Sequence, residues 1–437
     1  MTAAPLTDGI RPAGNGHLRA WRILLVILAA VYLIQIRTPL RLGADSVVLM
    51  AEGESVVQGT GFLDHGVKTP FPPGYPAVLA LLLEFGLARP WILIAFNLAC
   101  LALGLAGLCM LLQDPLEQPR VARMEIVCAF LLSYVVIKHT AMPLTDIPFF
   151  GLSMTCLASL AYAERQGLGR RFYAAVFIAG LFSLGALSMR RVGVALLPAF
   201  LWSAFSQKAL RSFLRIKSFR TLLAVVIGGV LIISPIVFRG LSYTTHDFGI
   251  ATRGKSMFSM ASTTLIDHVT ELGELAVNLP QRQLPASLRI VALFCLGIAI
   301  SLVILAGLLQ RRDRICSIDV YFISYIGIIF VWPYRDPRFW LPILPLVIAY
   351  ARVGLLGCLR TKLWVAPFQV FKVAFALAGV VALSYTTRLS LSGQDFPARY
   401  ATGPLRATYC AALNACGGQY DIKEVDPKIL HILQTYQ

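Results

Sequence analysis

Long apolar runs alternate with shorter polar connections along most of the chain, after a polar segment at residues 1–20. Most of these runs approach the roughly 17–25 residues that an α-helix needs to cross a bilayer. The pattern predicts an all-α polytopic membrane protein with about eleven transmembrane helices. They are expected at residues 21–36, 91–112, 125–138, 147–164, 172–188, 192–206, 221–238, 288–310, 316–332, 339–357 and 368–385.

One apolar run, Tyr75–Gly86, is treated differently because it is short and contains Glu84. A run of this length is more typical of a helix lying at the membrane interface than of one that crosses. The sequence therefore predicts interfacial helical structure in the first polar loop, which spans residues 37–90.

Composition supports the membrane assignment. Hydrophobic residues make up 57% of the 437 residues and charged residues only 14%, with a mean hydropathy of +0.72. A soluble domain would carry about a quarter charged residues. The net charge of +17 would suggest a nucleic-acid partner in a soluble chain. Here the excess of lysine and arginine in cytoplasmic loops of membrane proteins explains it, and we expect no nucleic-acid partner.

The distribution of charge predicts the orientation of the chain. With the N-terminus in the cytoplasm, the cytoplasmic segments hold 20 Lys and Arg against 7 acids, and everything else holds 19 against 15. This bias is what the positive-inside rule requires. It predicts an integral membrane protein with its N-terminus in the cytoplasm and a transmembrane domain at 1–385. A bacterial inner or plasma membrane is the expected location, which the charge bias does not itself indicate. Three segments, 37–90, 239–287 and the C-terminal tail 386–437, are expected on the outer side.

Two acidic residues stand at the outer face in this topology. Asp45 follows the first span and precedes a segment of helical pattern, and Asp146 precedes Pro148 at the start of another span. Either acid could simply cap a helix, where a carboxylate accepts free backbone N–H groups. Alternatively, two carboxylates at one interface could take a proton from an acceptor hydroxyl and orient it. Glu52, seven residues after Asp45, is expected on the same helical face.

Basic residues also fall on the outer side, against the general charge trend. They are Lys68, Arg190, Arg191, Arg335 and Arg338. Charges at bilayer depth are costly unless they are paired or functional, so snorkelling, or ion pairing with Asp45, Asp146 or Asp336, is the simpler interpretation. The functional interpretation is a phosphate site, because guanidinium groups bind phosphate oxygens in a bidentate geometry.

Histidine and cysteine patterns point to no metal centre. His65 and His139 are isolated and lack a third ligand at a telling spacing, so no metal is assigned. No CxxC motif occurs in the chain. Cys410 and Cys416, close together in the polar tail, are the one pair for which a disulfide is predicted.

Three motifs together resemble the GT-C glycosyltransferases that use polyprenyl-phosphate sugars, such as the aminoarabinose transferase acting on lipid A, the protein O-mannosyltransferases and the rhizobial core galacturonosyltransferases. The first motif combines Asp45, Gly59, Gly61 and Phe62 with FPPGYP ending at Pro76. The second is PLTDIPFF around Asp146, and the third is WPYRDPRFWLPILPLVIAY with Arg338, Phe339, Pro342 and Pro345. The basic turn at Arg190-Arg191 also fits the family pattern.

The resemblance implies transfer of a sugar from a polyprenyl-phosphate donor to an extracytoplasmic lipid, glycan or protein acceptor, with inversion. Asp45 would be the catalytic base or acceptor-positioning acid, with Asp146 as the second catalytic carboxylate. The expected substrate-binding residues are Glu52, His65, Lys68, Tyr75, Arg190, Arg191, Tyr334, Arg335 and Arg338. Membrane lipids are the other expected partners.

The chain departs from the family pattern at several positions. Leu49 and Phe339 stand where relatives carry tyrosine, which removes two hydroxyl groups and would alter the substrate. Lys68-Thr69-Pro70 replaces the Glu-Lys that precedes the loop proline in the aminoarabinose transferase. The glutamate tied to a metal there is absent, which argues against dependence on a divalent metal, and no other cofactor is assigned.

Two other functions use the same residues. A transporter or flippase for a lipid-linked or anionic substrate would pass a head group along the arginines, although transport sites lie near mid-membrane. A non-catalytic assembly subunit would keep the fold without the chemistry. Transport without product formation would indicate the first, and inactivity in a defined lipid-donor assay would indicate the second.

Overall fold

The computed structural model describes residues 15–166, 169–206, 249, 256–358 and 365–436. The predicted span 221–238 lies outside these residues. Helices account for nearly all of the regular structure described, and a short antiparallel hairpin of β1 (Leu63–Asp64) and β2 (Val67–Lys68) is the one sheet among the described residues.

The described α-helices follow one another in a single order. They are α1 (Asn15–Ile34), α2 (Ala44–Val57), α3 (Gly74–Glu84), α4 (Pro90–Gln113), α5 (Arg120–Leu131), α6 (Tyr134–Thr140), α7 (Asp146–Arg165), α8 (Arg170–Met189), α9 (Leu196–Ser206), α12 (Met257–Val277), α13 (Ala286–Gln310), α14 (Ser317–Val331), α15 (Leu344–Cys358), α16 (Val365–Ser390), α17 (Phe396–Tyr400), α18 (Gly403–Ala412) and α19 (Pro427–Thr435). Short 3-10 turns join several of them, among which η1 (Gln35–Arg37), η2 (Arg191–Ala195) and η5 (Pro337–Ile343) matter below.

Seven described helical stretches are long and apolar enough to cross a membrane, which identifies an α-helical integral membrane protein. They are Leu18–Arg37, Pro90–Gln113, Asp146–Arg165, Arg170–Met189, Arg289–Gln310, Pro337–Leu356 and Ala366–Ser390. Each coincides with a predicted span. The predicted spans at 192–206 and 316–332 correspond to helices of fewer than 18 residues, Arg191–Ala204 and Ser317–Val331.

Helix α7 forms the centre of the bundle and α16 its edge. The apolar window of α7 is 78% buried, whereas that of α16 is 11% buried. Glycines allow α7 to approach α4 closely: a Cβ on Gly151 would lie 2.4 Å from the Cys100 carbonyl oxygen. Close approach through small residues is the usual basis of helix packing in membranes, where the hydrophobic effect contributes little.

The prediction of one continuous span at 125–138 is wrong. The helix stops after Leu131, Ser133 is extended, and α6 restarts at Tyr134. The Asn278 side chain satisfies the interrupted backbone, because its amide nitrogen donates to the Leu132 carbonyl (2.9 Å) and its oxygen accepts from Tyr134 N–H (2.8 Å). Inside a membrane, a helix can break only where a partner such as Asn278 replaces the lost backbone hydrogen bonds.

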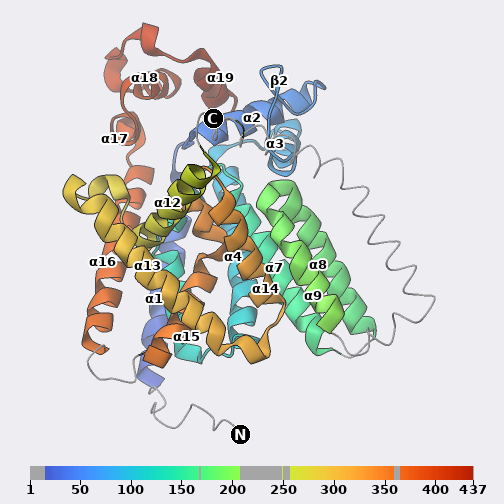
Figure 1. Ribbon diagram of the computed structural model, residues 1–437. Helices are drawn as coiled ribbons and strands as arrows, with labels where there is room; N and C mark the ends of the chain where they lie inside the picture. The colour runs from blue at the N-terminus through green and yellow to red at the C-terminus, as the bar shows by residue number, and fades with distance from the viewer. Residues whose placement is uncertain (1–14, 167–168, 207–248, 250–255, 359–364, 437) are drawn as a thin grey trace, which may run out of the picture.

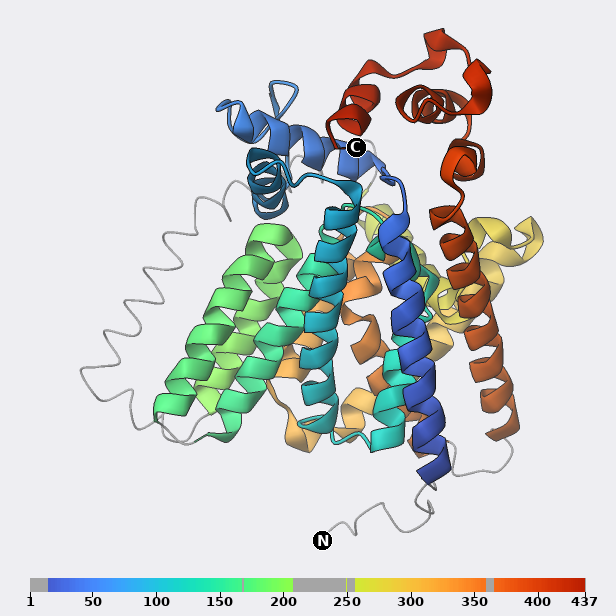
Figure 2. The ribbon, with the colours of Figure 1, turned by 180° about the vertical axis from the view of Figure 1, so that it is seen from behind.

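The first polar loop and the C-terminal tail lie together at the end of the bundle opposite the start of α1 (Figures 1 and 2). Two tyrosines of the tail bind the backbone of the segment at residues 38–43, which leads into α2. The Tyr409 hydroxyl donates to Leu40 O (2.8 Å) and accepts from Leu42 N–H (3.0 Å), and Tyr400 donates to Leu42 O (2.6 Å). The predicted disulfide between Cys410 and Cys416 is present beside Tyr409. The tail therefore fixes the entry to α2.

Candidate active site

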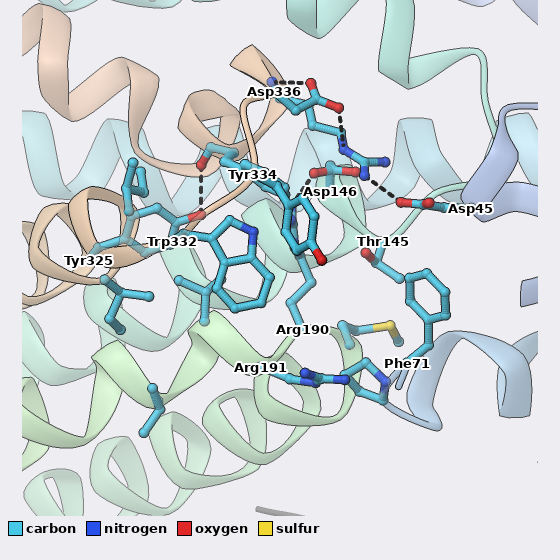
Figure 3. A pocket seen from close by; sticks show the side chains of 18 of the residues that line it. Asp45, Phe71, Thr145, Asp146, Arg190, Arg191, Tyr325, Trp332, Tyr334 and Asp336 are labelled. Carbon is cyan, nitrogen blue, oxygen red and sulfur yellow. Dashed lines mark hydrogen bonds and ion pairs between the residues drawn. The ribbon is translucent and has the colours of Figure 1, made fainter. Parts of the chain in front are cut away.

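A cavity of about 860 Å³ opens where several helix ends meet. Its walls come from the start of α2, the proline segment at 70–72, the α7 N-terminus, the turn between α8 and η2, and the turn between α14 and η5. Figure 3 shows acidic and basic side chains from these elements converging on one space. Seven predicted site residues line it: Asp45, Asp146, Arg190, Arg191, Tyr334, Arg335 and Arg338.

Asp45 lies in the first turn of α2, but it does not cap the helix. The N-cap is Gly43, whose N–H donates to Ser46 Oγ at 3.2 Å. The Asp45 carboxylate instead bonds to the Arg338 guanidinium, 293 residues further along the chain. The Asp45 side chain remains 30% exposed, so one face of the carboxylate is open to the cavity.

Arg338 is oriented by a second carboxylate. Asp336 accepts from the Arg338 backbone N–H at 3.0 Å and forms an ion pair with its Nε at 2.9 Å. Asp336 is thereby the N-cap of η5, and its carboxylate and that of Asp45 both bind the Arg338 guanidinium. Two carboxylates on one guanidinium hold it in a single orientation.

Asp146 and Arg190 form a more deeply buried ion pair. Asp146 is the first residue of α7, with Thr145 at the N-cap position, and only 2% of its side chain is exposed. Arg190 follows the last residue of α8, and its guanidinium also lies 5.3 Å from the Phe339 ring centroid. The ion pair with Asp146 and the contact of the guanidinium with the Phe339 ring together offset the cost of burying two charges.

Arg191 and Arg335 tie two other segments to the cavity wall. The Arg191 guanidinium donates to the Pro70 carbonyl, which fastens the proline segment of the first loop to η2. Arg335 lies 3.7 Å from an Asp267 oxygen and 3.9 Å from a Glu274 oxygen, both on α12. These separations are long, and 29% of the Arg335 side chain is exposed.

Four predicted substrate-binding residues lie away from the cavity. Glu52 lies away from Asp45 because seven residues of helix displace it by about 10 Å along the helix axis. Its side chain is buried and accepts a hydrogen bond from Thr69 of the same loop. His65 pairs with Asp64 in the exposed hairpin, at 2.5 Å. Lys68 is exposed on β2, and Tyr75 is fully buried in α3 beside Phe96. The binding role predicted for these four has no support in the geometry.

Glu52 provides a test of the loop packing through pH. Burial, reinforced by Asp64 and opposed by the Thr69 hydrogen bond, raises the pKa of its carboxyl group to about 7. A raised folded-state pKa means that stability falls as pH rises from about 4.5 to about 7.

We expect Glu52→Gln to melt like the wild type at pH 5 and at a higher temperature than the wild type at pH 8. Thermal unfolding in detergent at both pH values measures this, with exposed Glu84→Gln as the matched control. Equal pH slopes for Glu52→Gln and wild type would contradict the burial argument.

Asp336 lines the cavity and pairs with Arg338, which is the ion-pairing alternative that the sequence left open. Other site residues were not predicted, among them Trp332, which also lines the cavity. On α12, Asp267 and Glu274 bind Arg335, and Glu271 accepts the Trp340 indole N–H at 2.8 Å. The available signal was the spacing of these three acids at i, i+4 and i+7, which puts them on one face of a helix.

Among the residues that the structure describes, no group of three or more His, Cys, Asp and Glu side chains is arranged to hold a metal ion. Comparison of the chain with protein-family models, curated proteins and solved structures finds no match. We therefore argue its function from the geometry of the cavity.

Proposed function

We propose that the protein is a GT-C-type glycosyltransferase that moves a sugar from a polyprenyl-phosphate donor to an acceptor on the outer side of the membrane. The observation that carries this proposal is the pairing of Asp45 with Arg338 on the wall of a cavity of about 860 Å³. A half-open carboxylate, oriented by a guanidinium, suits a base that works beside an anionic leaving group.

Asp45 would accept the proton of the acceptor hydroxyl. The acceptor oxygen would attack the anomeric carbon of the donor, and the bond from that carbon to the phosphate oxygen would break. The electron pair leaves with the phosphate, which needs charge neutralisation rather than a proton. General-base assistance of this kind contributes about 10²–10⁴-fold in rate.

Arg338 and Arg335, three residues apart in sequence, are suited to stabilise the departing phosphate, and Arg191 of η2 also lines the cavity. Arg335 can turn toward an anion at small cost, because its two ion pairs are long. Arg190 is bound to Asp146, so these two residues would shape the site rather than contact the donor. Their role in the proposal is to position the cavity wall.

The lining also suits an amphiphilic donor. Beside the charged residues, the wall includes apolar side chains of α14 and η2, among them Ile328, Val331, Val192 and Val194. A polyprenyl chain would lie along this apolar side while its phosphate meets the arginines. An apolar pocket with a few convergent polar groups is the usual form of a small-molecule site.

The proposal includes the topology derived from charge: about eleven spans, a cytoplasmic N-terminus, and α3 at the outer interface. Two observations support an outer location for the cavity. Its residues lie at helix ends on the side that carries the first loop and the tail. The tail also contains the Cys410–Cys416 disulfide, and disulfides persist outside the reducing cytosol.

The test is transfer by purified protein in liposomes, with a panel of polyprenyl-phosphate sugars and lipid extracts as acceptors. We expect product to appear together with free polyprenyl phosphate, and mass spectrometry of envelope glycolipids and glycoproteins with and without the gene to identify the same sugar. Movement of the lipid-linked sugar across the bilayer without product would instead indicate a flippase. Absence of both would overturn the proposal.

A further inference from the structure

His268, on α12, lies outside the cavity but contacts the turn that forms its wall. Its side chain is 1% exposed, and the Glu271 side chain beside it is fully buried. His268 Nδ1 lies 2.7 Å from Glu271 Oε2, and Nε2 lies 2.8 Å from the Trp332 carbonyl oxygen. Trp332 follows the last residue of α14 in extended conformation, at the start of the turn that carries Arg335 and Arg338.

The chemistry of these partners determines the proton count of the ring. A neutral imidazole has one donor and one acceptor nitrogen. A carbonyl oxygen and an ionised carboxylate can only accept, so both ring nitrogens must donate. Glu271 Oε2 also accepts the Trp340 indole N–H, so this oxygen already acts as an acceptor toward a second donor. This set of partners is the one that an imidazolium requires.

We propose that His268 is a positioning residue that acts as a buried imidazolium, holding the Trp332 carbonyl and with it the turn carrying Arg335 and Arg338. Its effect on catalysis rests on the proposed function, whereas its charge state does not. Loss of the ring's second proton would put a lone pair against the Trp332 carbonyl and release the turn.

The surrounding charges favour this state. Burial lowers the pKa of the His268 ring, but the hydrogen bond and charge of Glu271, with the Trp332 carbonyl and Asp267, outweigh it and raise the pKa above its usual value. On the facing turn and η5 the charged groups are Arg335, which binds Asp267 and Glu274, and the Asp336–Arg338 pair, and Tyr134 of α6 donates to Glu274 at 2.6 Å. The charged residue of α14, Asp319, binds Arg311 and Tyr350 instead. Helices α13 and α16, which also pack on α12, carry no charged side chain between residues 290 and 310 or 373 and 387.

The direction of the pH effect follows from the raised pKa. A group whose pKa is raised on folding stabilises the fold below its unfolded pKa, and this contribution is lost as pH rises through the folded value. The turn is therefore held below the folded pKa of the ring and released as pH rises through it. Glu271→Gln removes the charge that retains the proton, so it moves the release to lower pH.

The first experiment reads the charge state directly. The chain has six histidines, so ¹⁵N-histidine labelling gives few ring signals, and the His268 signal is assigned by its loss in His268→Gln. We expect this ring to remain doubly protonated at pH values above about 6.5, where a free imidazole is mostly neutral. A His268 ring that loses its second proton at or below the pH at which a free imidazole does would overturn the proposal.

The second experiment reads the positioning role. We expect His268→Gln to speed amide hydrogen exchange about tenfold in the peptide covering residues 332–339, which corresponds to the loss of one charge-assisted hydrogen bond. Exchange in this peptide at the wild-type rate would overturn the positioning role. His431→Gln is the matched control and should leave exchange there unchanged.

The third experiment links the ring to transfer. Wild type should lose activity on the alkaline side, Glu271→Gln should lose it at lower pH, and His268→Gln should be about tenfold slower without that alkaline loss. Identical pH profiles for all three would show that the ring does not act on catalysis. Wild-type protein that transfers no sugar at any pH would count against the proposed function alone, and the exchange and labelling experiments would still decide the charge state and the positioning role.

Discussion

Replacement of Asp45 by asparagine is expected to lower sugar transfer by at least about 100-fold while leaving the protein folded. Asparagine has nearly the same shape, and its carbonyl can still accept from Arg338, which Asp336 continues to hold. What the variant lacks is the ability to take a proton. Donor binding should therefore persist while turnover is lost, and single-turnover transfer in liposomes separates the two.

Asp64→Asn is the matched control for this variant. Asp64 lies in the same loop, on β1, and pairs with His65, and it does not line the cavity. It should transfer at the wild-type rate. If Asp45→Asn keeps half of the wild-type rate at equal protein level, Asp45 is not the base.

The second large effect concerns stability and is independent of any reaction. Arg190→Gln leaves the Asp146 carboxylate, 2% exposed, without its cation. Removing one partner of a buried pair typically costs about 3–5 kcal/mol, because a charge remains buried without compensation. We expect the double variant Arg190→Gln with Asp146→Asn to recover most of this loss, since no charge is then left. Denaturation in mixed detergent micelles measures the free energy of unfolding for each variant.

Arg388→Gln is the control for the comparison of the single and double variants, because Arg388 is exposed near the end of α16. Its unfolding should match that of wild type. Wild-type stability of Arg190→Gln, or a double variant no more stable than Arg190→Gln, would show that the pair is not coupled as described.

Some of the cavity could be predicted from the sequence and some could not. Asp45, Asp146 and the arginines were found because acids and bases are rare in such an apolar chain and stood out at helix boundaries. Glu52 was predicted to bind substrate because it shares a helical face with Asp45. Two residues on one face can still lie far apart along the helix axis, and these two do. Residues of α12, such as His268 and Glu271, were passed over because the groups that tie them to the cavity wall, Trp332 and Trp340, lie more than sixty residues away in sequence.

The order of apolar and polar segments by itself determined that the chain is an all-α membrane protein and where most of its long helices run, because bilayer thickness and backbone hydrogen bonding leave few alternatives. Only the tertiary structure decided that the predicted span at 125–138 breaks, since Asn278 supplies the hydrogen bonds at the break. It also decided which acid meets which arginine. Asp45 pairs with Arg338, and Asp146 with Arg190, because the ends of separate helices pack against one another. No local sequence pattern encodes the distance between two helix ends.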